Sequence, residues 1–471
     1  MPFKLQQIPS ESKFCQALRL PLLEKYYPRE LVCELLSRCH GWEKRERKLS
    51  QLLIVYYVIA LSLFRQFNVT EVFAHLSRAL RWLWPDPSIA LPTGGALTAR
   101  RQSLGIVVLR QLVRRCCRPL ATKATKGAFG LGLRLMAIDG TLDEVPDTPA
   151  NALHFGRLSA GTNQSAYPQV RCLYLLEAGT HAIIDAVAAR CKASEQELCG
   201  CLLRSMEPGM LVMSDRNFLS VTWLASVQQR GAHVLSRLAA GLFTQRSRTL
   251  SDGSYLVTLH PRGQEALTMR IIEYDLHPLV AADLALLPTS RNANPAKPGS
   301  AHRLLTTLLD PEQAPALELI ELYHERWEIE LSIEEIKIHQ RLSPRPLRSK
   351  SPELLYQEFY GLLLAHYAIR AWMHEAAVHA DLDPDRLSFT HAMHVLDTAS
   401  YEFAITDASQ WPQLRQRLLA DLCEPKFLLP PRRLRFCPRV VKRPFSHFRR
   451  KQRWHPSFHF KGSTFKDLLL I

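Results

Sequence analysis

Apolar residues recur along the first part of the chain in the way that buried helices require. Residues 52–64 are almost continuously apolar, which predicts a helix buried on most sides, and the run is too short to cross a bilayer. Thr70 can cap a second helix over residues 71–83. Leu and Val return at helical spacing between residues 96 and 120. The pattern predicts a helical region over residues 1–130.

After this region the pattern changes to short apolar runs that end in acids. Residues 133–138 predict a strand that presents Asp139 at its C-terminal end, where Gly140 allows a tight exit and close approach of a ligand. Residues 210–214 predict a second short strand, and it ends at Asp215. Each strand thus delivers one aspartate, although an Asp after a strand is often only a turn former.

The residues between and after these strands complete a mixed pattern. Residues 170–177 and 181–190 predict a hairpin, residues 193–205 a helix, and residues 231–237 a further strand. Strands and helices over residues 131–238 therefore predict an α/β core.

A long helix is predicted from Pro315 to Lys337, with Pro315 in its first turn and no Pro or Gly after it. On an ideal helix Tyr323, Arg326, Glu330 and Lys337 fall within roughly 60° of one another, on one narrow stripe. Most charged helices are solvated surface helices with ion pairs, and Arg326 can pair with Glu330 in that way. The apolar residues that border the stripe favour the edge of a core instead.

Three further segments follow from composition and spacing. Residues 239–313 contain short β-like runs and turns, which predicts a β-rich insertion. Residues 347–373 predict an apolar helix that packs under the core, and the chain remains helical to about residue 421. Residues 432–466 contain no Asp or Glu and many Lys and Arg, with aromatic residues interleaved.

The charge balance indicates a polyanionic partner. Among 471 residues, 47% are hydrophobic and 22% charged, which is typical of a folded soluble protein, but the net charge is +16. Nucleic acid is the first candidate for the partner, and a membrane surface the second. The 11 cysteines include no Cys-x-x-Cys pair and no signal peptide precedes them, which favours reduced thiols in a cytoplasm.

Two groups of basic residues are the candidates for contacts with a nucleic-acid backbone. Arginines spaced along one element can follow a row of phosphates, although a solvated basic face has the same pattern. The candidates are Arg100, Arg101, Arg114, Arg115, Arg449, Arg450 and Lys451.

Carboxylates that converge from two strand ends and a helix form a hard, oxygen-only site. Such a site selects Mg²⁺, or Mn²⁺, and has room for two ions. Two ions activate an attacking oxygen and stabilise a leaving oxygen at phosphorus. Asp139 and Asp215 are two candidates for ligands, and on the helix Glu330 competes with Glu334 and Glu335. The helical wheel alone does not choose between Glu330 and Glu334.

The motifs resemble those of the insertion-sequence-4-like family of bacterial DDE transposases. The helix carries the order Tyr-x2-Arg-x3-Glu-x6-Lys, and Asp139–Gly140–Thr141 and Asp215–Arg216–Asn217–Phe218 are similar to the first and second aspartate motifs. The resemblance selects Glu330 as the third acid. It implies that the catalytic and metal-binding residues are Asp139, Asp215 and Glu330, and that Tyr323, Arg326 and Lys337 contact DNA.

The resemblance also implies a fold and a domain order. An RNase H-like core, residues 131–238 and 314–375, is interrupted by the β-rich insertion 239–313. A helical DNA-binding domain (1–130) precedes the core, and a helical region with a basic tail (376–471) follows it. In relatives that form DNA hairpins, an aromatic residue of the insertion holds a flipped base. The insertion here lacks Trp, which leaves Tyr255 and Tyr274 as substitutes.

The function implied is cleavage at transposon ends and their joining to target DNA. The partners implied are double-stranded DNA, with terminal inverted repeats and a target, and a second copy of the chain in a homodimer on that DNA. The location implied is the bacterial cytoplasm, at the nucleoid. Two alternatives stay open: a catalytically silent DNA-binding protein derived from a transposase, and an RNase H-like nuclease.

The basic tail leads to a test by salt dependence. Each phosphate contact releases counterions, so DNA affinity should fall steeply with salt, and deletion of residues 432–466 should flatten the slope of log affinity against log salt. Fluorescence anisotropy at several salt concentrations measures both slopes. A slope that the deletion leaves unchanged would assign the tail to solvent.

Overall fold

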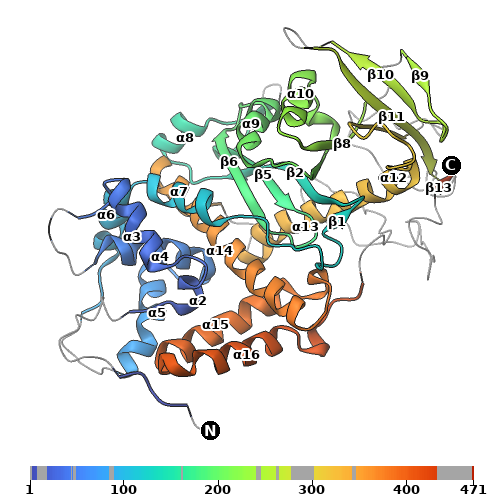
Figure 1. The fold of residues 1–471 in the computed structure, drawn as a ribbon. Helices are drawn as coiled ribbons and strands as arrows, with labels where there is room; N and C mark the ends of the chain where they lie inside the picture. Colours follow the sequence, from blue (N-terminus) through green and yellow to red (C-terminus); the bar gives the residue numbers. More distant parts are fainter. Residues whose placement is uncertain are drawn as a thin grey trace, which may run out of the picture. The chain divides into compact units, whose positions relative to one another are not determined.

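The computed structural model describes residues 3–7, 18–43, 45, 49–83, 90–160, 163–239, 245–260, 265–276, 302–341, 346–431 and 469–470. The chain divides into two compact units. Figure 1 shows the helices and strands, coloured along the sequence. The first unit contains Met1–Phe129, Ala137–Ser205 and Glu328–Pro430. The second contains Gly130–Met136, Met206–Trp327 and Pro431–Ile471.

Helices form the N-terminal part of the first unit, as predicted. They are α2 (Pro21–Glu24), α3 (Arg29–Arg38), α4 (Gln51–Leu63), α5 (Val69–Leu83), α6 (Gly94–Leu104) and α7 (Val107–Cys116). Helix α4 is buried over most of its length and packs against α14 (Pro352–His379). A Cβ at Gly361 would lie 2.8 Å from the carbonyl oxygen of Val58, so glycine permits this close approach. Among the described residues no helix is long and apolar enough to span a bilayer.

The residue that caps α5 differs from the predicted one. The Asn68 side chain accepts a hydrogen bond from the Glu71 amide (2.9 Å), and the Glu71 carboxylate accepts one from the Asn68 amide (2.8 Å). This reciprocal pair satisfies two amides that the first helical turn leaves without partners. Thr70 instead donates its hydroxyl to the Asn68 side chain. The expected cap at Thr70 was therefore wrong by two residues.

The first unit contains three adjacent strands in the order β6-β5-β2. Strands β5 (Gln169–Glu177) and β6 (Ile183–Arg190) form the predicted hairpin, with Val170 opposite Arg190. The predicted helix over residues 193–205 is α9 (Glu195–Leu202) continued by a 3₁₀ turn (Leu203–Ser205). The shorter elements are β1 (Phe129–Gly130), α8 (Pro149–Phe155), β3 (Ser159–Ala160) and β4 (Asn163–Gln164).

Strand β2 (Leu133–Glu144) is longer than predicted. It continues through Asp139 for five more residues, so Asp139 lies inside the strand and not at its C-terminal end. Gly140 serves the packing of the sheet: a Cβ there would lie 3.4 Å from the carbonyl oxygen of Cys172 on β5 and 3.0 Å from Glu195. The expected tight exit at Gly140 was wrong, because β5 pairs beside this part of β2.

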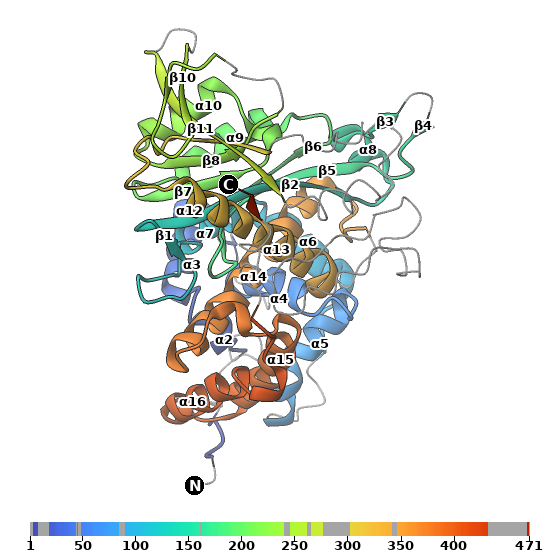
Figure 2. The ribbon, with the colours of Figure 1, turned by 90° about the vertical axis from the view of Figure 1, so that its right-hand side faces the viewer.

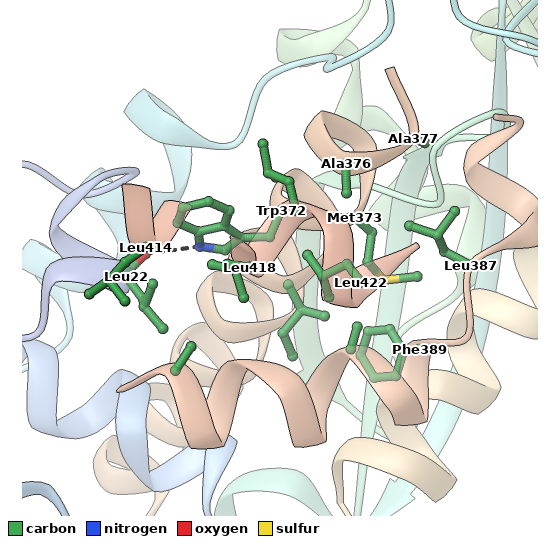
Figure 3. Close-up of a cluster of buried hydrophobic side chains, with 14 of the residues drawn as sticks. Leu22, Trp372, Met373, Ala376, Ala377, Leu387, Phe389, Leu414, Leu418 and Leu422 are labelled. Carbon is green, nitrogen blue, oxygen red and sulfur yellow. Dashed lines mark hydrogen bonds between the residues drawn. The ribbon is translucent and has the colours of Figure 1, made fainter. Parts of the chain in front are cut away.

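The C-terminal helices of the first unit close a hydrophobic cluster (Figure 3). Helix α14 begins after Ser351, inside the range 347–373 predicted for a helix, and α15 (Phe389–Ile405) and α16 (Trp411–Leu422) pack against it and each other (Figure 2). The indole N–H of Trp372 donates to the Leu22 carbonyl oxygen (3.2 Å). Short 3₁₀ turns cover Pro384–Arg386, Ala408–Gln410 and Pro425–Phe427.

The second unit is built on strands with a long antiparallel extension. Strand β7 (Met210–Ser214) pairs in parallel with β8 (His233–Arg237), and helix α10 (Val221–Gln229) connects them. Beyond β8 the order is β12 (His302–Thr306), β11 (Leu267–Leu276), β10 (Tyr255–Leu259) and β9 (Arg248–Thr249). The β-rich insertion thus continues the sheet through the β12–β8 pair. Strand β13 (Leu469–Leu470) pairs with β11.

The predicted long helix is a chain of different helical turns. Helix α12 (Ala316–His324) leads into a 3₁₀ turn (Glu325–Trp327), α13 (Glu328–Glu334) and the π-helical turn η4 (Glu335–Gln340). Residues per turn differ between these types, so the wheel calculated for an ideal α-helix was wrong across residues 325–327 and 335–340. The two units also divide between Trp327 and Glu328.

Glu358 on α14 shows how the first unit tolerates a buried charge. Its carboxylate accepts hydrogen bonds from the amides of Arg348 (2.9 Å) and Ser349 (2.9 Å) and pairs with Arg65. Burial by itself would raise the pKa of Glu358, but Arg65 and the Arg348 amide outweigh it and lower the pKa from 4.5 to about 2.

We expect Glu358→Gln to reduce stability at pH 7 by about 3 kcal/mol, because a pKa lowered on folding stabilises the protein above the unfolded pKa. The difference between wild type and variant should shrink as the pH falls from about 4.5 towards 2. Urea unfolding across this pH range measures it, with the exposed Glu353→Gln as control. A constant difference would contradict the lowered pKa.

Candidate active site

Asp139 lies on a face of β2 that carries further polar residues. Residues alternate between the two faces of a strand, so Asp139, Thr141 and Asp143 share one face. One Asp139 oxygen accepts a hydrogen bond from the Gly140 amide (2.7 Å). Asp139 is half-buried, whereas Asp143 is buried. This face of β2 therefore offers one solvent-accessible carboxylate beside an enclosed one.

Lys337 reaches this same face of β2. Its Nζ contacts the Thr141 hydroxyl and lies 3.2 Å from the Leu142 carbonyl oxygen and 3.3 Å from Asp143 Oδ1. Arg341 also contacts Asp143 Oδ1, at 2.7 Å. Burial would raise the pKa of Asp143, but Arg341 and Lys337 reverse the effect and lower it. The lysine of the helix motif is therefore one side-chain position away from Asp139.

Glu330 lies on α13, seven residues before Lys337, and is half-buried. Of its two rivals, Glu335 is buried, and its carboxylate is bonded to Arg370 and His366. Arg370 lowers the pKa of Glu335 well below its usual range although burial opposes this. The Glu335 carboxylate is thus paired inside the protein, whereas Glu334 is half-buried like Glu330.

In the second unit, Asp215 has its own group of motif residues. Asp215 directly follows β7, and its Oδ1 accepts a hydrogen bond from the Arg216 amide (2.7 Å) at the start of a 3₁₀ turn (Arg216–Phe218). The Tyr323 hydroxyl donates to the carbonyl oxygen of Ser214 (3.2 Å). Arg326 is buried, and its guanidinium carbon lies 5.8 Å from the centre of the Tyr323 ring.

These contacts place Tyr323 and Arg326 near Asp215 within one unit. Burial raises the pKa of Tyr323; Arg326 opposes this rise and Asp215 adds to it, so both charges act on the hydroxyl.

The two aromatic candidates of the insertion differ in accessibility. Tyr255 is buried and its hydroxyl donates to Glu273 (2.8 Å), so the structure does not support it as a base-stacking residue. Tyr274 is partly buried and stacks on His302 with ring centres 5.3 Å apart. Arg237 lies 3.4 Å from His302. Tyr274 is the better of the two candidates.

The basic residues of α6 and α7 separate into buried and exposed ones. Arg101 is buried and bonded to Gln357 and the Leu354 carbonyl oxygen, so a phosphate contact by Arg101 is not supported. Arg100 donates to the Leu49 carbonyl oxygen (3.0 Å) and is half-buried. Arg114 and Arg115 are exposed on α7. Arg449, Arg450 and Lys451 lie outside the described residues.

A buried polar cluster in the first unit was not predicted from the sequence. It consists of His181, Glu328, Glu335, Arg370 and Asp385. The members come from a strand connection, two helical turns, α14 and a later 3₁₀ turn. The sequence did contain one signal for this cluster, namely charged residues among the apolar positions of predicted helices. These residues are Arg370 in the predicted helix 347–373 and Glu335 in the predicted long helix.

The three predicted acids suit divalent metal ions by their chemistry. Asp139, Asp215 and Glu330 are all half-buried carboxylates, hence accessible from solvent and made only of hard oxygen donors. A second group, His181, Glu328 and Asp385, brings three donor atoms within 4.8 Å of one another, but all three residues are buried.

The contacts of Asp143 lead to a stability prediction. The side chain of Arg341 is 5% exposed and that of Lys337 is 29% exposed. We expect Arg341→Met to reduce the free energy of unfolding by about 3 kcal/mol, since it breaks a buried pair, and Lys337→Met by about 1 kcal/mol. Urea unfolding measures both. Equal losses would contradict the assignment of Arg341 as the main structural partner of Asp143.

Comparison with known proteins identifies the family. Residues 18–114 match the family described as insertion element 4 transposase N-terminal, and residues 130–367 match the transposase DDE domain. The transposase InsG for insertion sequence element IS4 of Escherichia coli (strain K12) is 30% identical over 439 residues, which covers 92% of this chain and 94% of InsG. InsZ of the same organism is 24% identical over 213 residues, covering 45% of this chain and 69% of InsZ.

A solved synaptic complex of piggyBac transposase with hairpin DNA matches 90% of this chain and 88% of its own, with 10% identity and a TM-score of 0.40. The DDE domain match agrees with the mixed sheet and helices described above and confirms the RNase H-like fold class. The chain belongs to the IS4 family of insertion-sequence DDE transposases, which are enzymes that cut and transfer DNA.

Proposed function

We propose that Asp139, Asp215 and Glu330 together hold two Mg²⁺ ions, with Mn²⁺ as a substitute, and that the site cuts transposon ends and joins them to target DNA. The observation that carries this proposal is the contact of Lys337 with Thr141 on the Asp139 face of β2. It links the helix motif to the first aspartate motif within the first unit. Glu330 lies about two helical turns before Lys337 on the same helical segment.

Contacts within the second unit also support the proposal. Tyr323 donates to Ser214, the residue before Asp215, so the start of the helix motif is tied to the second aspartate motif. Since Trp327 is bonded to Glu328, the same helical run carries both sets of contacts. The match to the transposase DDE domain supports the use of all three acids in one reaction.

The proposed ions, when bound, supply a lowered pKa for the attacking water or 3′-hydroxyl and positive charge beside the leaving oxygen. The chain itself contributes the three carboxylates that hold the ions. Arg326 provides a planar guanidinium for two phosphate oxygens, and Lys337 a point charge for one. Tyr323 stacks on the DNA end in this proposal. Arg114 and Arg115, exposed on α7, are the proposed contacts for the DNA backbone outside the site.

The proposed partners are double-stranded DNA with terminal inverted repeats, the target DNA and a second copy of the chain. The proposed location is the cytoplasm, at the nucleoid when the protein is bound to DNA. A silent DNA-binding protein is less well supported, because all three acids and the Tyr, Arg and Lys of the motif are retained. A simple nuclease needs neither the insertion nor the basic flanks.

Substitution of the acids tests the proposal. We expect Asp139→Ala, Asp215→Ala and Glu330→Ala each to slow cleavage at least about a thousandfold, on the order of 4 kcal/mol in the barrier, because each removes a metal ligand. DNA binding should remain close to that of the wild type. Single-turnover cleavage of DNA that carries the ends of the element, with a gel-shift assay, measures both effects.

Glu334→Ala is the matched control, since Glu334 is the remaining half-buried acid of α13. It should cleave at close to the normal rate. An active Glu330→Ala protein together with an inactive Glu334→Ala protein would show that the wrong acid had been chosen.

A further inference from the structure

The buried polar cluster of His181, Glu328, Glu335, Arg370 and Asp385 encloses one side of the helical segment that carries Glu330. His181 Nε2 lies 2.9 Å from Glu328 and 3.3 Å from Asp385, and its Nδ1 lies 3.3 Å from Glu335. Arg370 contacts Glu335 through Nε (2.9 Å) and through Nη2. The side chains of all five are at most 9% exposed.

Two of the three acids of this cluster, Glu328 and Glu335, alternate along the chain with the two motif residues. Glu330 follows Glu328 by two residues, and Lys337 follows Glu335 by two residues. Two residues correspond to roughly 200° around an α-helix and somewhat less around a π-turn. Glu328 and Glu335 therefore hold one face of the segment, and Glu330 and Lys337 project from the other. The contact of Lys337 with Thr141 on β2 agrees with this division.

The segment needs such fixation because its own hydrogen bonding is irregular. Helix α13 is only 7 residues long, with a 3₁₀ turn before it and a π-turn after it. Apolar packing by itself permits a helix to rotate or slide, whereas directional bonds to a planar guanidinium and an imidazole fix its rotation. Gln340 adds a bond at the far end, from its Nε2 to the Leu362 carbonyl oxygen (3.1 Å).

The partners of Glu328 and Glu335 are themselves held rigidly. Arg370 and His366 lie one turn apart on α14, and both pack against the Phe389 ring. His181 has a backbone φ of 58°, in the left-handed region, on the connection between β5 and β6. The anchoring groups thus come from the central helix and the sheet of the first unit.

We propose that this cluster positions Glu330 and Lys337 by fixing the rotation of residues 328–340, which makes Glu328, Glu335, His181 and Arg370 positioning residues of the reaction. The inference rests on the proposed function, because it assigns the cluster to the metal site that Glu330 completes.

A metal ion held by the cluster itself is a different reading of the same group. His181, Glu328 and Asp385 offer the donor atoms for it. Burial and Arg370 oppose a charged His181, but hydrogen bonds to Asp385, Glu328 and Glu335 raise its pKa to about 10. Arg370 Nη2 also lies 2.7 Å from His181 Nδ1, so hydrogen bonds and ion pairs among the five side chains account for the cluster.

The test compares two buried carboxylates of the first unit, of which only Glu335 belongs to the cluster. Glu335→Gln alters the cluster, and Glu358→Gln alters an equally buried acid whose partners, Arg65 and Arg348, do not belong to it. Both variants should be less stable than wild type. At a temperature well below melting, Glu335→Gln should weaken Mn²⁺ binding to the full-length protein about ten- to a hundredfold, and slow cleavage by a similar factor. Glu358→Gln should leave Mn²⁺ affinity within about twofold.

Mn²⁺ affinity is measured by electron paramagnetic resonance on the full-length protein bound to DNA, and affinity for that DNA should not change. Arg370→Lys is the second variant, since it keeps the charge but loses the two-pronged contact with Glu335. It should show the same weakening of Mn²⁺ binding with a smaller loss of stability. If Glu335→Gln and Arg370→Lys bind Mn²⁺ as Glu358→Gln does, the positioning role is overturned.

Two controls separate this inference from the proposed function. Asp139→Asn should weaken Mn²⁺ binding in otherwise wild-type protein; if it does not, the proposed metal site fails, and the inference fails with it. A stoichiometric metal in the purified protein that His181→Ala removes and Asp139→Asn retains would overturn the ion-pair description of the cluster. Elemental analysis of both variants decides between these outcomes.

Discussion

The ion pair between Arg370 and Glu335 connects the central helix of the first unit to the helical turns of the motif. Two charges buried in a low-dielectric interior must be paired and hydrogen-bonded, because either one left unpaired destabilises the fold by several kcal/mol. Only a few side-chain arrangements satisfy this requirement. The pair thereby restricts how α14 and the π-turn meet far more strictly than apolar contact would.

The same requirement recurs around the first aspartate motif. Asp143 is paired with Arg341 and Lys337, and this pairing brings the π-turn against β2. The π-turn is thus held from two sides, by Glu335 towards α14 and by Lys337 and Arg341 towards β2. Glu335, Lys337 and Arg341 lie within seven residues of one another, so one short stretch of chain makes contacts in both directions.

Two glycines and one strand pairing allow neighbouring elements to pack closely. Gly361 permits α4 and α14 to approach closely, and Gly140 permits β5 to lie beside β2 next to Asp139. In the second unit, strand β12 of the insertion pairs with the edge of β8, so this edge is covered. The insertion is thereby attached to the sheet at a strand, β12, that shortly precedes α12 with Tyr323 and the 3₁₀ turn with Arg326.

Local patterns in the sequence are sufficient for elements whose formation depends on near neighbours. The hydrophobic run of α4, the β5–β6 hairpin and most of α14 follow from periodicity and turn residues, and the spacing of four motif residues indicates the family. The cap at Asn68 was missed by two residues, because the Asn68 side chain accepts the Glu71 amide while the Thr70 hydroxyl bonds to Asn68.

Other features depend on partners distant in the chain, and only the tertiary structure decided them. Strand β2 continues beyond Asp139 because β5 lies beside it, and Arg101 is buried because α14 supplies its partners. Glu335 differs from Glu334 because Arg370 meets it from 35 residues away. The sequence determined which residues carry charge and with what local period. Which charges turn inward was decided by long-range contacts, since the cost of burial depends on the partner that each charge finds.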